Sequence, residues 1–303
     1  MRAADIGALL LVNFIWGSTY VAGKGVLDTA PPLVLAFLRF FLSVLCLFCL
    51  GAYRMPKNED GERGSVRQEL RNTVLLGVVG FALAKLLHYE GLARSTATDA
   101  ALLVNLEAIF TALLAALWLG QRLGAPQWAG VLLAFSGGLL LVWPGDGFHF
   151  GRSVGNLILI ASVLAEAVAT VLGARAMQRL SGLQVTAFGS VWGMLCLAPL
   201  AWWQWRADGF STAWLTWGNA AATLYLALVA TVFAYVLWFR VLGRVEAGRA
   251  AVFLYAQPLV GVLLAVLLRG EWPTLLGLAG GLLVLAGLHL ASREAPDPAA
   301  APG

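Results

Sequence analysis

The chain has 303 residues, of which 60% are hydrophobic and 12% are charged, and its formal net charge is +4. Because soluble domains carry a charge on about a quarter of their residues, this composition excludes a soluble globular protein and predicts an all-α integral membrane protein. A membrane-spanning helix needs about 20 mostly apolar residues. By that length we predict ten transmembrane helices, at residues 4–27, 32–52, 72–92, 96–118, 128–144, 155–178, 183–205, 218–242, 247–268 and 274–291.

The chain offers little to a cofactor, a metal or a nucleic acid. The first predicted helix follows Met1 and Arg2 as a signal sequence would, but its length and the lack of a small-residue cleavage site predict that it is retained. Cys46 and Cys49 have CxxC spacing, yet their apolar neighbours are typical of buried or lipid-facing thiols. The longest polar stretch, 53–71, is too short for a soluble catalytic or nucleotide-binding domain. We therefore expect no cofactor, no bound metal and no ATP drive, and we assign the basic residues to loops rather than to nucleic-acid binding.

The first and third predicted helices carry polar and aromatic side chains at helical spacing. Asn13, Trp16 and Tyr20 share one face of the first helix, and Lys85 and Tyr89 share one face of the third. Aromatic rings with a polar tip bind cations and flat groups well, so these five residues are candidates for substrate binding. Tyrosine also forms belts at membrane interfaces, and we favour that alternative for Tyr89, which lies toward a helix end.

Charged residues within apolar helices are unusual, because a charge at the bilayer centre costs about 2.5 to 3.5 kcal/mol on insertion scales. Lys85 in the third helix and Glu107 in the fourth lie at similar depth and are expected to neutralise each other. Such a pair serves either the structure or the substrate. Arg39 in the second helix is expected to anchor the outer interface or to act as a gate, since arginine snorkels toward water.

The sixth predicted helix carries a polar stripe of Ser162, Glu166 and Thr170 with no cation nearby in sequence. Apolar surroundings would favour the neutral form of the Glu166 carboxyl. We therefore interpret Glu166 either as a substrate-binding proton carrier that couples transport to protons or as a hydrogen-bonded carboxyl that packs against another helix.

The eighth and ninth predicted helices complete the candidate site. Thr231, Tyr235 and Trp238 share one face of the eighth helix. We interpret Tyr235 as a substrate-binding residue, and Trp238 either as another or as part of an interfacial belt. In the ninth helix Gln257 is a further substrate-binding candidate. Pro258 removes a backbone hydrogen bond, so we predict a hinge there.

The chain is an internal duplication. A shift of 150 residues brings fourteen of the forty-four residues at 97–140 into identity with 247–290. The informative matches are three glycine pairs: Gly120 with Gly270, Gly130 with Gly280, and Gly137 with Gly287. We therefore divide the chain into a five-helix repeat at 1–150 and a second at 151–303. Under this shift Lys85 matches Tyr235 and Glu107 matches Gln257, which predicts a substrate site with one charged and one neutral wall.

Small residues lie at close-packing spacing in the fifth and tenth predicted helices. These are Gly130, Ala134 and Gly138 in the former and Gly277 and Gly281 in the latter. We interpret them as helix-packing faces that serve either the scaffold of one chain or a homodimer.

The basic residues indicate an orientation. With a cytoplasmic N-terminus, thirteen lysines and arginines face the cytoplasm and five face outward, while Arg39 and Lys85 lie within helices. The outward residues are Lys24, Arg94, Arg152, Arg206 and Arg269. Since basic residues concentrate in cytoplasmic loops, both termini are predicted to be cytoplasmic. Five helices per repeat then insert the second repeat upside down relative to the first.

Short motifs along the whole chain resemble the EamA family of the drug/metabolite transporter superfamily. They are Ile15-Trp16-Gly17-Ser18, Leu38-Arg39-Phe40, Gln257-Pro258, Gly270-Glu271 and Gly280. The resemblance implies a 5+5 inverted-repeat exporter of amino acids or other small metabolites in the bacterial inner membrane. It also implies a central cavity lined by helices 1 to 4 and 6 to 9. The chain departs from the family's pattern at Ala108 and Gln121, where the family has Pro and Glu.

Taken together, the residues and the resemblance favour a transporter that moves a small solute through a midplane cavity by alternating access, without chemical change. A flippase for lipid-linked sugars or other amphipaths is the alternative transport function. A membrane-embedded enzyme is the alternative of another class, but His88, His149 and His289 are scattered and no catalytic constellation accompanies them.

Overall fold

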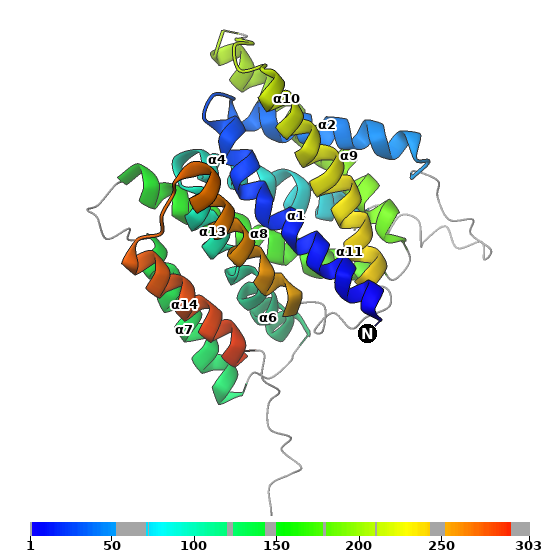
Figure 1. Ribbon diagram of the computed structural model, residues 1–303. Helices are drawn as coiled ribbons and strands as arrows, with labels where there is room; N and C mark the ends of the chain where they lie inside the picture. The colour runs from blue at the N-terminus through cyan, green and yellow to red at the C-terminus, as the bar shows by residue number, and fades with distance from the viewer. Residues whose placement is uncertain are drawn as a thin grey trace, which may run out of the picture.

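The computed structural model describes residues 2–52, 71, 73–119, 124–142, 150–177, 180–209, 211–242 and 252–291, and the regular elements in these ranges are helices (Figure 1). The loop residues Gly120 and Gln121 lie outside the described residues. So do nine of the thirteen basic residues assigned to the cytoplasmic side: Arg54, Lys57, Arg63, Arg67, Arg122, Arg179, Arg244, Arg249 and Arg293.

The two halves of the chain contain matching series of helices. The first half forms α1 (Ala3–Leu27), α2 (Pro32–Cys49), the π-helix η1 (Gly77–Leu83), α4 (Ala84–Arg94), α5 (Ala97–Leu103), α6 (Leu106–Leu119) and α7 (Ala125–Val142). The second half forms α8 (Phe150–Ala176), α9 (Gly182–Ala207), α10 (Trp217–Leu224), the π-helix η2 (Tyr225–Phe233), α11 (Ala234–Leu242), the 3₁₀-helix η3 (Val252–Tyr255), α13 (Ala256–Arg269) and α14 (Leu275–Ala291).

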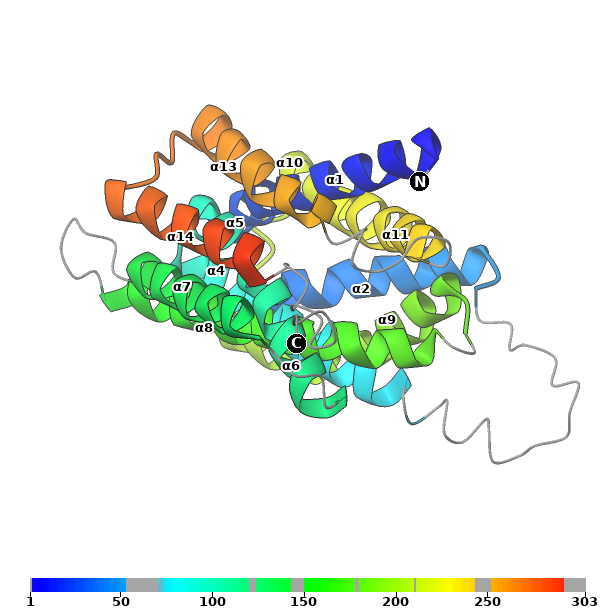
Figure 2. The ribbon, with the colours of Figure 1, turned by 90° about the horizontal axis from the view of Figure 1, so that it is seen from below.

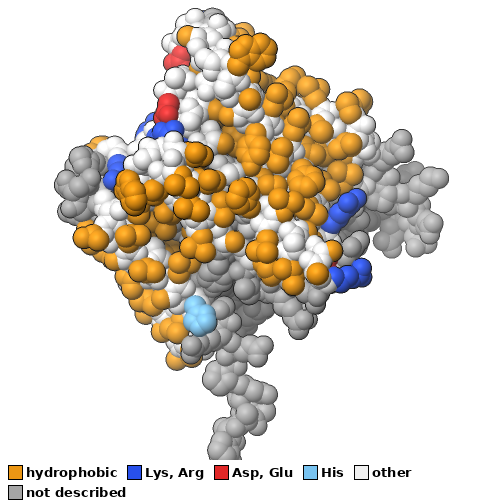
Figure 3. Space-filling view, in the orientation of Figure 1, with side chains coloured by type: hydrophobic (Ala, Val, Ile, Leu, Met, Phe, Trp, Pro, Cys, Tyr) orange, Lys and Arg blue, Asp and Glu red, His pale blue; other side chains and the backbone are white. Residues whose placement is uncertain are grey.

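Several of these helices suit a bilayer. Among the described residues, six helices are long and apolar enough to cross a membrane: Ala3–Leu27, Pro32–Cys49, Thr73–Arg94, Phe150–Gly173, Gly182–Ala207 and Trp217–Trp238. Shorter apolar helices follow at Trp128–Leu141, Ala256–Arg269 and Leu275–Gly287. Hydrophobic side chains cover most of the face shown in Figure 3, and charged side chains lie at its margins. The protein is thus a multi-pass, all-helical membrane protein, while the total of ten spanning helices stays a prediction.

One predicted helix is broken. The segment predicted as 96–118 turns at Val104 and Asn105, which separate α5 from α6. The side chain of Asn105 donates to the Leu102 carbonyl at 3.1 Å, and asparagine side chains compete in this way with helical backbone bonds. The continuous helix expected from the apolar pattern was therefore wrong at this point.

The π-helical stretches occupy equivalent places in the two halves. A shift of 150 residues moves Gly77–Leu83 onto 227–233, the end of η2. In both cases an α-helix follows directly, α4 after η1 and α11 after η2. π-Helical turns are rare and frequently mark functional sites. Here they precede the helices that carry Lys85 and Tyr235.

Helix contacts also follow a two-fold pattern. The contact of α1 with α13 corresponds to the contact of α8 with α6 in the other half. In the same way, the contact of α4 with α8 corresponds to that of α11 with α1. Likewise η1 contacts α9 and η2 contacts α2, while α2 contacts α9 and α7 contacts α14. Each contact has a counterpart obtained by exchanging the halves, or is its own counterpart. Figures 1 and 2 show α7 and α14 side by side at one edge of the bundle.

Two of the three glycine pairs shared by the halves, Gly130 with Gly280 and Gly137 with Gly287, lie at that α7–α14 contact. A Cβ atom on Gly137 would lie 2.5 Å from the Gly280 carbonyl oxygen, and one on Gly287 would lie 2.5 Å from the Gly130 carbonyl oxygen. These contacts are reciprocal under the 150-residue shift, as in a two-fold interface. They also run in opposite directions along the two helices, so α7 and α14 are antiparallel. The backbones approach so closely that a larger residue would have to displace a helix.

The other small residues identified in the sequence are divided between this contact and the bundle. Ala134 contacts Gly287, Gly138 lies against Leu106, and Gly281 lies against Leu102. These contacts fill the spaces beside the small residues, which fits the scaffold interpretation, and a homodimer stays a prediction.

Candidate functional site

The buried charges pair differently from the sequence prediction. Lys85 on α4 forms an ion pair with Glu166 on α8. The predicted pairing of Lys85 with Glu107 was wrong, because Glu107 on α6 instead accepts a hydrogen bond of 3.0 Å from Thr170 Oγ1. The reason is the packing: α8 lies against both α4 and α6, so its polar stripe meets both side chains.

All three side chains of the polar stripe on the sixth predicted helix, now α8, bond to neighbouring helices. Ser162 Oγ donates to the Ala84 carbonyl at 3.0 Å, Glu166 pairs with Lys85, and Thr170 donates to Glu107. The Lys85 and Glu166 side chains keep 11% and 17% of their surface exposed, so the pair is partly open. The cation that Glu166 meets is therefore distant in sequence: Lys85 lies 81 residues before it.

Three of the candidate residues connect α1 to α13 directly. Gln257 Nε2 donates to Asn13 Oδ1 at 3.1 Å, and Tyr20 lies nearby with its hydroxyl 3.5 Å from Gln257 Oε1. Asn13 also donates to the Leu9 carbonyl at 2.7 Å. Asn13, Tyr20 and Gln257 are buried, and their bonds join α1 to α13. Pro258 lies in the first turn of α13, directly after η3, where a proline is tolerated because its missing N–H would have no helical partner.

An aromatic cluster surrounds Trp16. The Trp16 ring centroid lies 5.2 Å from that of Tyr235 and 5.3 Å from that of Trp238. Its indole nitrogen donates to the Ala230 carbonyl in η2 at 3.2 Å, and Phe81 of η1 lies 6.0 Å from Tyr235. The cluster therefore joins α1 and α11 to both π-helical stretches.

Arg39 is a central residue that the sequence did not identify as a candidate for substrate binding. It is only 4% exposed; Nε donates to Thr231 Oγ1 at 2.7 Å and Nη1 to Tyr89 Oη at 3.0 Å. Its interpretation as an interfacial anchor was therefore wrong. Tyr89, 1% exposed, is likewise buried rather than part of a belt. The signal in the sequence was the charge within an apolar run. Because the arginine side chain is long, the sequence could not show whether it extends to the membrane surface or turns into the bundle.

The charged residues and tyrosines gather in one region, which we call the polar centre: Tyr20, Arg39, Lys85, His88, Tyr89, Glu107, Glu166 and Tyr235. Tyr20 lies within electrostatic range of Glu107, Glu166 and Tyr235, and Lys85 within range of Arg39 and Tyr235. The ring of His88, another residue missing from the candidate list, lies 5.9 Å from that of Tyr20 and 5.4 Å from that of Tyr89. The structure thus brings Tyr20, Lys85, Tyr89, Glu107, Glu166 and Tyr235 together, with Trp16 and Trp238 beside Tyr235 and Asn13 and Gln257 beside Tyr20.

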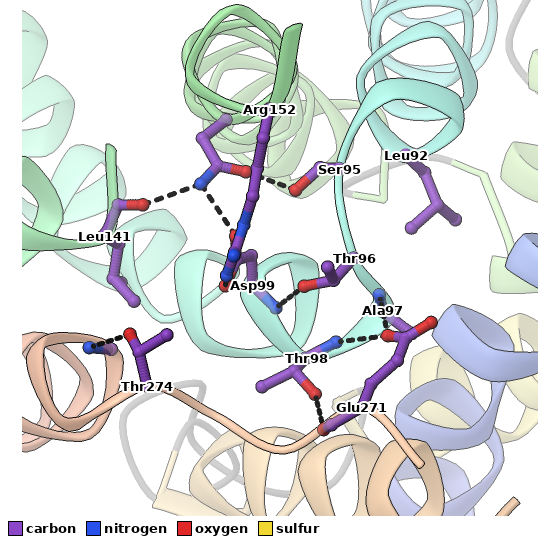
Figure 4. A network of polar contacts seen from close by, with 12 residues as sticks. Leu92, Ser95, Thr96, Ala97, Thr98, Asp99, Leu141, Arg152, Glu271 and Thr274 are labelled. Carbon is purple, nitrogen blue, oxygen red and sulfur yellow. Dashed lines mark hydrogen bonds and ion pairs between the residues drawn. The ribbon is translucent and has the colours of Figure 1, made fainter. Parts of the chain in front are cut away.

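A second polar group, the end network, ties helix ends together (Figure 4). Asp99 of α5 accepts two hydrogen bonds from Arg152 of α8, at 2.8 and 3.0 Å. Asn156 donates to Asp99 at 2.9 Å and to the Leu141 carbonyl at 2.6 Å. Asp99 is 2% exposed, and Arg152 binds it through two parallel hydrogen bonds. Bidentate pairs of this type are stronger than single hydrogen bonds.

Glu271, in the segment between α13 and α14, extends the end network to α5. Its carboxylate accepts from the backbone nitrogen of Ala97 at 2.7 Å, and its carbonyl accepts from Thr98 Oγ1 at 2.8 Å (Figure 4). Arg269 donates to Glu271 at 2.6 Å and pairs with Asp28, with 3.1 Å between the charged atoms. The ends of α1, α5, α8 and α13 are thereby linked at one end of the bundle.

The described residues contain no cluster of three or more His, Cys, Asp or Glu that could hold a metal ion. The polar centre instead presents opposite charges and aromatic rings inside an apolar bundle, an arrangement suited to holding a polar organic solute.

Comparison with known proteins identifies the family. The model of the EamA-like transporter family matches this chain twice, at residues 4–143 and 153–293. The chain belongs to the EamA-like transporter family. It is 30% identical over 300 residues to a probable amino-acid metabolite efflux pump of Salmonella typhimurium, with 96% of this chain and 95% of the relative covered. It is 27% identical over 289 residues to a probable terminal-alkyne amino-acid exporter of Streptantibioticus cattleyicolor, with 95% and 93% covered.

An EamA-like transporter of this kind acts on a small molecule and contacts membrane lipid. An uncharacterized transporter of Archaeoglobus fulgidus is 29% identical to the chain over 292 residues, covering 94% of this chain and 96% of the relative. A crystal structure with 20% sequence identity and a TM-score of 0.64 covers 96% of this chain and 97% of its own, and it shares the fold.

Proposed function

We propose that this EamA-like transporter exports amino acids or related amphipathic solutes across the bacterial inner membrane, and that it acts without chemical change to the solute. The observation that carries the proposal is the polar centre. It places Arg39, Lys85, Glu107 and Glu166 inside an apolar helical bundle, where charged groups are costly unless they serve binding or transport. Relatives named as an amino-acid efflux pump and an amino-acid exporter support this class of solute.

We further propose that the chain consists of two inverted five-helix repeats, 1–150 and 151–303, within ten spanning helices. The two matches of the family model, the paired π-helical stretches and the reciprocal glycine contacts of α7 and α14 support this division. The antiparallel packing of α7 and α14 supports a two-fold axis that runs across the helices. Such an axis lies in the membrane plane, and exchanging the conformations of the halves then opens the site to each side in turn.

The end network would close one route to the polar centre. Lys24, Arg152 and Arg269 belong to the end assigned to the outside by the distribution of basic residues. There, Lys24 Nζ donates to the Leu92 carbonyl at 2.9 Å, Arg152 holds Asp99 and Arg269 holds Asp28 and Glu271. With both termini in the cytoplasm, these bonds support a state closed toward the outside, from which export would require the ion pairs to separate.

Transport is tested with inverted membrane vesicles, in which export appears as uptake of radiolabelled L-amino acids. We expect the wild type to accumulate at least one of them, and Lys85→Met to lower the initial rate more than tenfold. Arg94→Gln, which removes an exposed guanidinium at a helix end, is the matched control and should keep the wild-type rate. Absence of wild-type uptake across all proteinogenic amino acids would refute the proposed solute class.

The same vesicles test proton coupling. We propose that a proton taken up by Glu166 breaks its ion pair with Lys85 and thereby links the proton gradient to the change of conformation. An imposed pH gradient should then stimulate wild-type uptake, and Glu166→Gln should abolish the stimulation. A Glu166→Gln protein with the wild-type response would remove this residue from the coupling mechanism.

A further inference from the structure

Arg39 occupies an unusual environment for a charged side chain. It lies on α2, which packs against α4, α9 and η2, and it is 4% exposed. Its partners are the hydroxyl groups of Thr231 and Tyr89. Both are neutral, so Arg39 has no carboxylate hydrogen-bonded to it among the described residues. A buried charge ordinarily needs such a counter-charge.

The carboxylates nearby are already engaged. Glu166 lies within electrostatic range of Arg39, but it is the ion-pair partner of Lys85. Glu107 accepts a hydrogen bond from Thr170, which lies one turn after Glu166 on α8. The Lys85–Glu166 pair is neutral as a whole, so it leaves the positive charge of Arg39 uncompensated in its immediate surroundings.

One nitrogen of the guanidinium is available. Within the described residues, Nε and Nη1 are hydrogen-bonded and Nη2 is not. Across the same residues, a buried side-chain nitrogen or oxygen without a partner occurs at Ser190 Oγ and nowhere else. Nη2 is therefore not a fully buried unpartnered atom, and the guanidinium keeps this one donor free within the polar centre.

The fixed nitrogens determine how the free one points. Thr231 of η2 and Tyr89 of α4 hold the planar guanidinium from two helices, and Thr231 Oγ1 is itself anchored to the Leu226 carbonyl at 2.8 Å. A guanidinium held in this way keeps its remaining donor in one direction and loses little freedom when an anion arrives. These are the properties of a residue arranged to recognise a planar oxyanion.

We propose that Arg39 determines specificity for solutes with a carboxylate, by donating from Nη2 to that group. The proposal rests on the proposed function and deepens it: the solute must carry a carboxylate, and an otherwise identical neutral amide is discriminated against. Thr231 and Tyr89 act as positioning residues, because they hold Arg39 without being required to touch the solute.

The test measures binding to the purified full-length protein in detergent. Each proteinogenic L-amino acid and its amide is titrated in a thermal-shift assay, and the acid with the highest affinity is followed by calorimetry together with its amide. A hydrogen bond to a charged group corresponds to about 10- to 100-fold in affinity. The wild type should therefore prefer the acid by at least about tenfold, whereas Arg39→Gln should bind acid and amide within about threefold of each other.

Control variants separate recognition from folding. Arg39→Lys keeps the charge but not the planar fork, so it should retain part of the preference. Arg94→Gln should retain all of it. Should Arg39→Gln fail to give a monodisperse protein, Tyr89→Phe provides the second test: it frees Nη1 and should lower the preference for the acid while amide binding changes little.

The outcomes distinguish the two proposals. If no amino acid binds the wild type, the proposed function fails and the carboxylate subsite fails with it. If an amino acid binds but its amide binds equally well, or if Arg39→Gln keeps the wild-type preference, the proposed function stands and the assignment of Arg39 is overturned.

Discussion

Removing one member of the Lys85–Glu166 ion pair should destabilise the protein far more than removing both. The two side chains are 11% and 17% exposed, so most of each is shielded from water. Breaking a fully buried pair costs about 3 to 5 kcal/mol, because the remaining charge is uncompensated. Because this pair keeps some exposure, we expect Glu166→Gln to lower the free energy of unfolding by about 2 to 3 kcal/mol, just below that range.

The double variant Lys85→Met with Glu166→Gln should recover to within about 1 kcal/mol of the wild type, since replacing both charges by neutral groups is often close to neutral. The coupling energy of this double-mutant cycle should therefore be at least about 1 kcal/mol. Unfolding is followed by SDS titration of the protein in mixed micelles, with helical circular dichroism as the signal. The matched cycle uses Glu107→Gln, which by the structure is not the partner of Lys85. A larger coupling of Lys85 to Glu107 than to Glu166, or additive losses at Lys85 and Glu166, would refute the assignment of the pair.

Two further results test the scaffold and the end network. Gly137→Ala should lower the free energy of unfolding by about 1 to 3 kcal/mol, because its Cβ would meet the backbone of α14. The control Gly7→Ala, with nothing within 4 Å of its Cβ, should leave stability unchanged or slightly raised in the same SDS titration. Equal effects of the two substitutions would argue against the close α7–α14 contact. Asp99→Asn weakens the bond to Arg152. A membrane-impermeant maleimide added outside should then label a cysteine introduced as Val104→Cys several-fold faster. An unchanged labelling rate would show that the end network is no barrier.

The sequence predicted the helical membrane protein because its signal is local. A bilayer-spanning helix satisfies its own backbone hydrogen bonds and shows as an apolar run, so long helices such as α1 and α9 can be read from composition. The duplication was visible for a related reason: Gly137, Gly280 and Gly287 lie where two backbones touch, and a Cβ atom at any of them would meet the backbone of the other helix. The break between α5 and α6 was missed, because a single polar residue, Asn105, interrupts a run that is otherwise apolar.

The membership of the candidate site was also largely predictable, since ionisable and aromatic residues within apolar helices are few. Lys85, Glu107, Glu166 and Tyr235 were identified in this way, and the structure gathers them in the polar centre. The sequence could not say which of them meet. Their partners lie on helices distant along the chain, and a rotation of one helix by a single residue would change every pairing.

Tertiary structure alone decided those pairings. Because their helices follow one another in the chain, the sequence suggested that Lys85 pairs with Glu107. In the structure α8 packs against both α4 and α6, so Lys85 pairs with Glu166 and Glu107 is hydrogen-bonded to Thr170. It also decided the position of Arg39: the same long side chain can snorkel to water or turn inward, and the hydroxyls of Tyr89 and Thr231, on two other helices, hold it inside. Apolar periodicity along one helix determines what enters the membrane, but the packing of helix against helix determines which polar groups meet there.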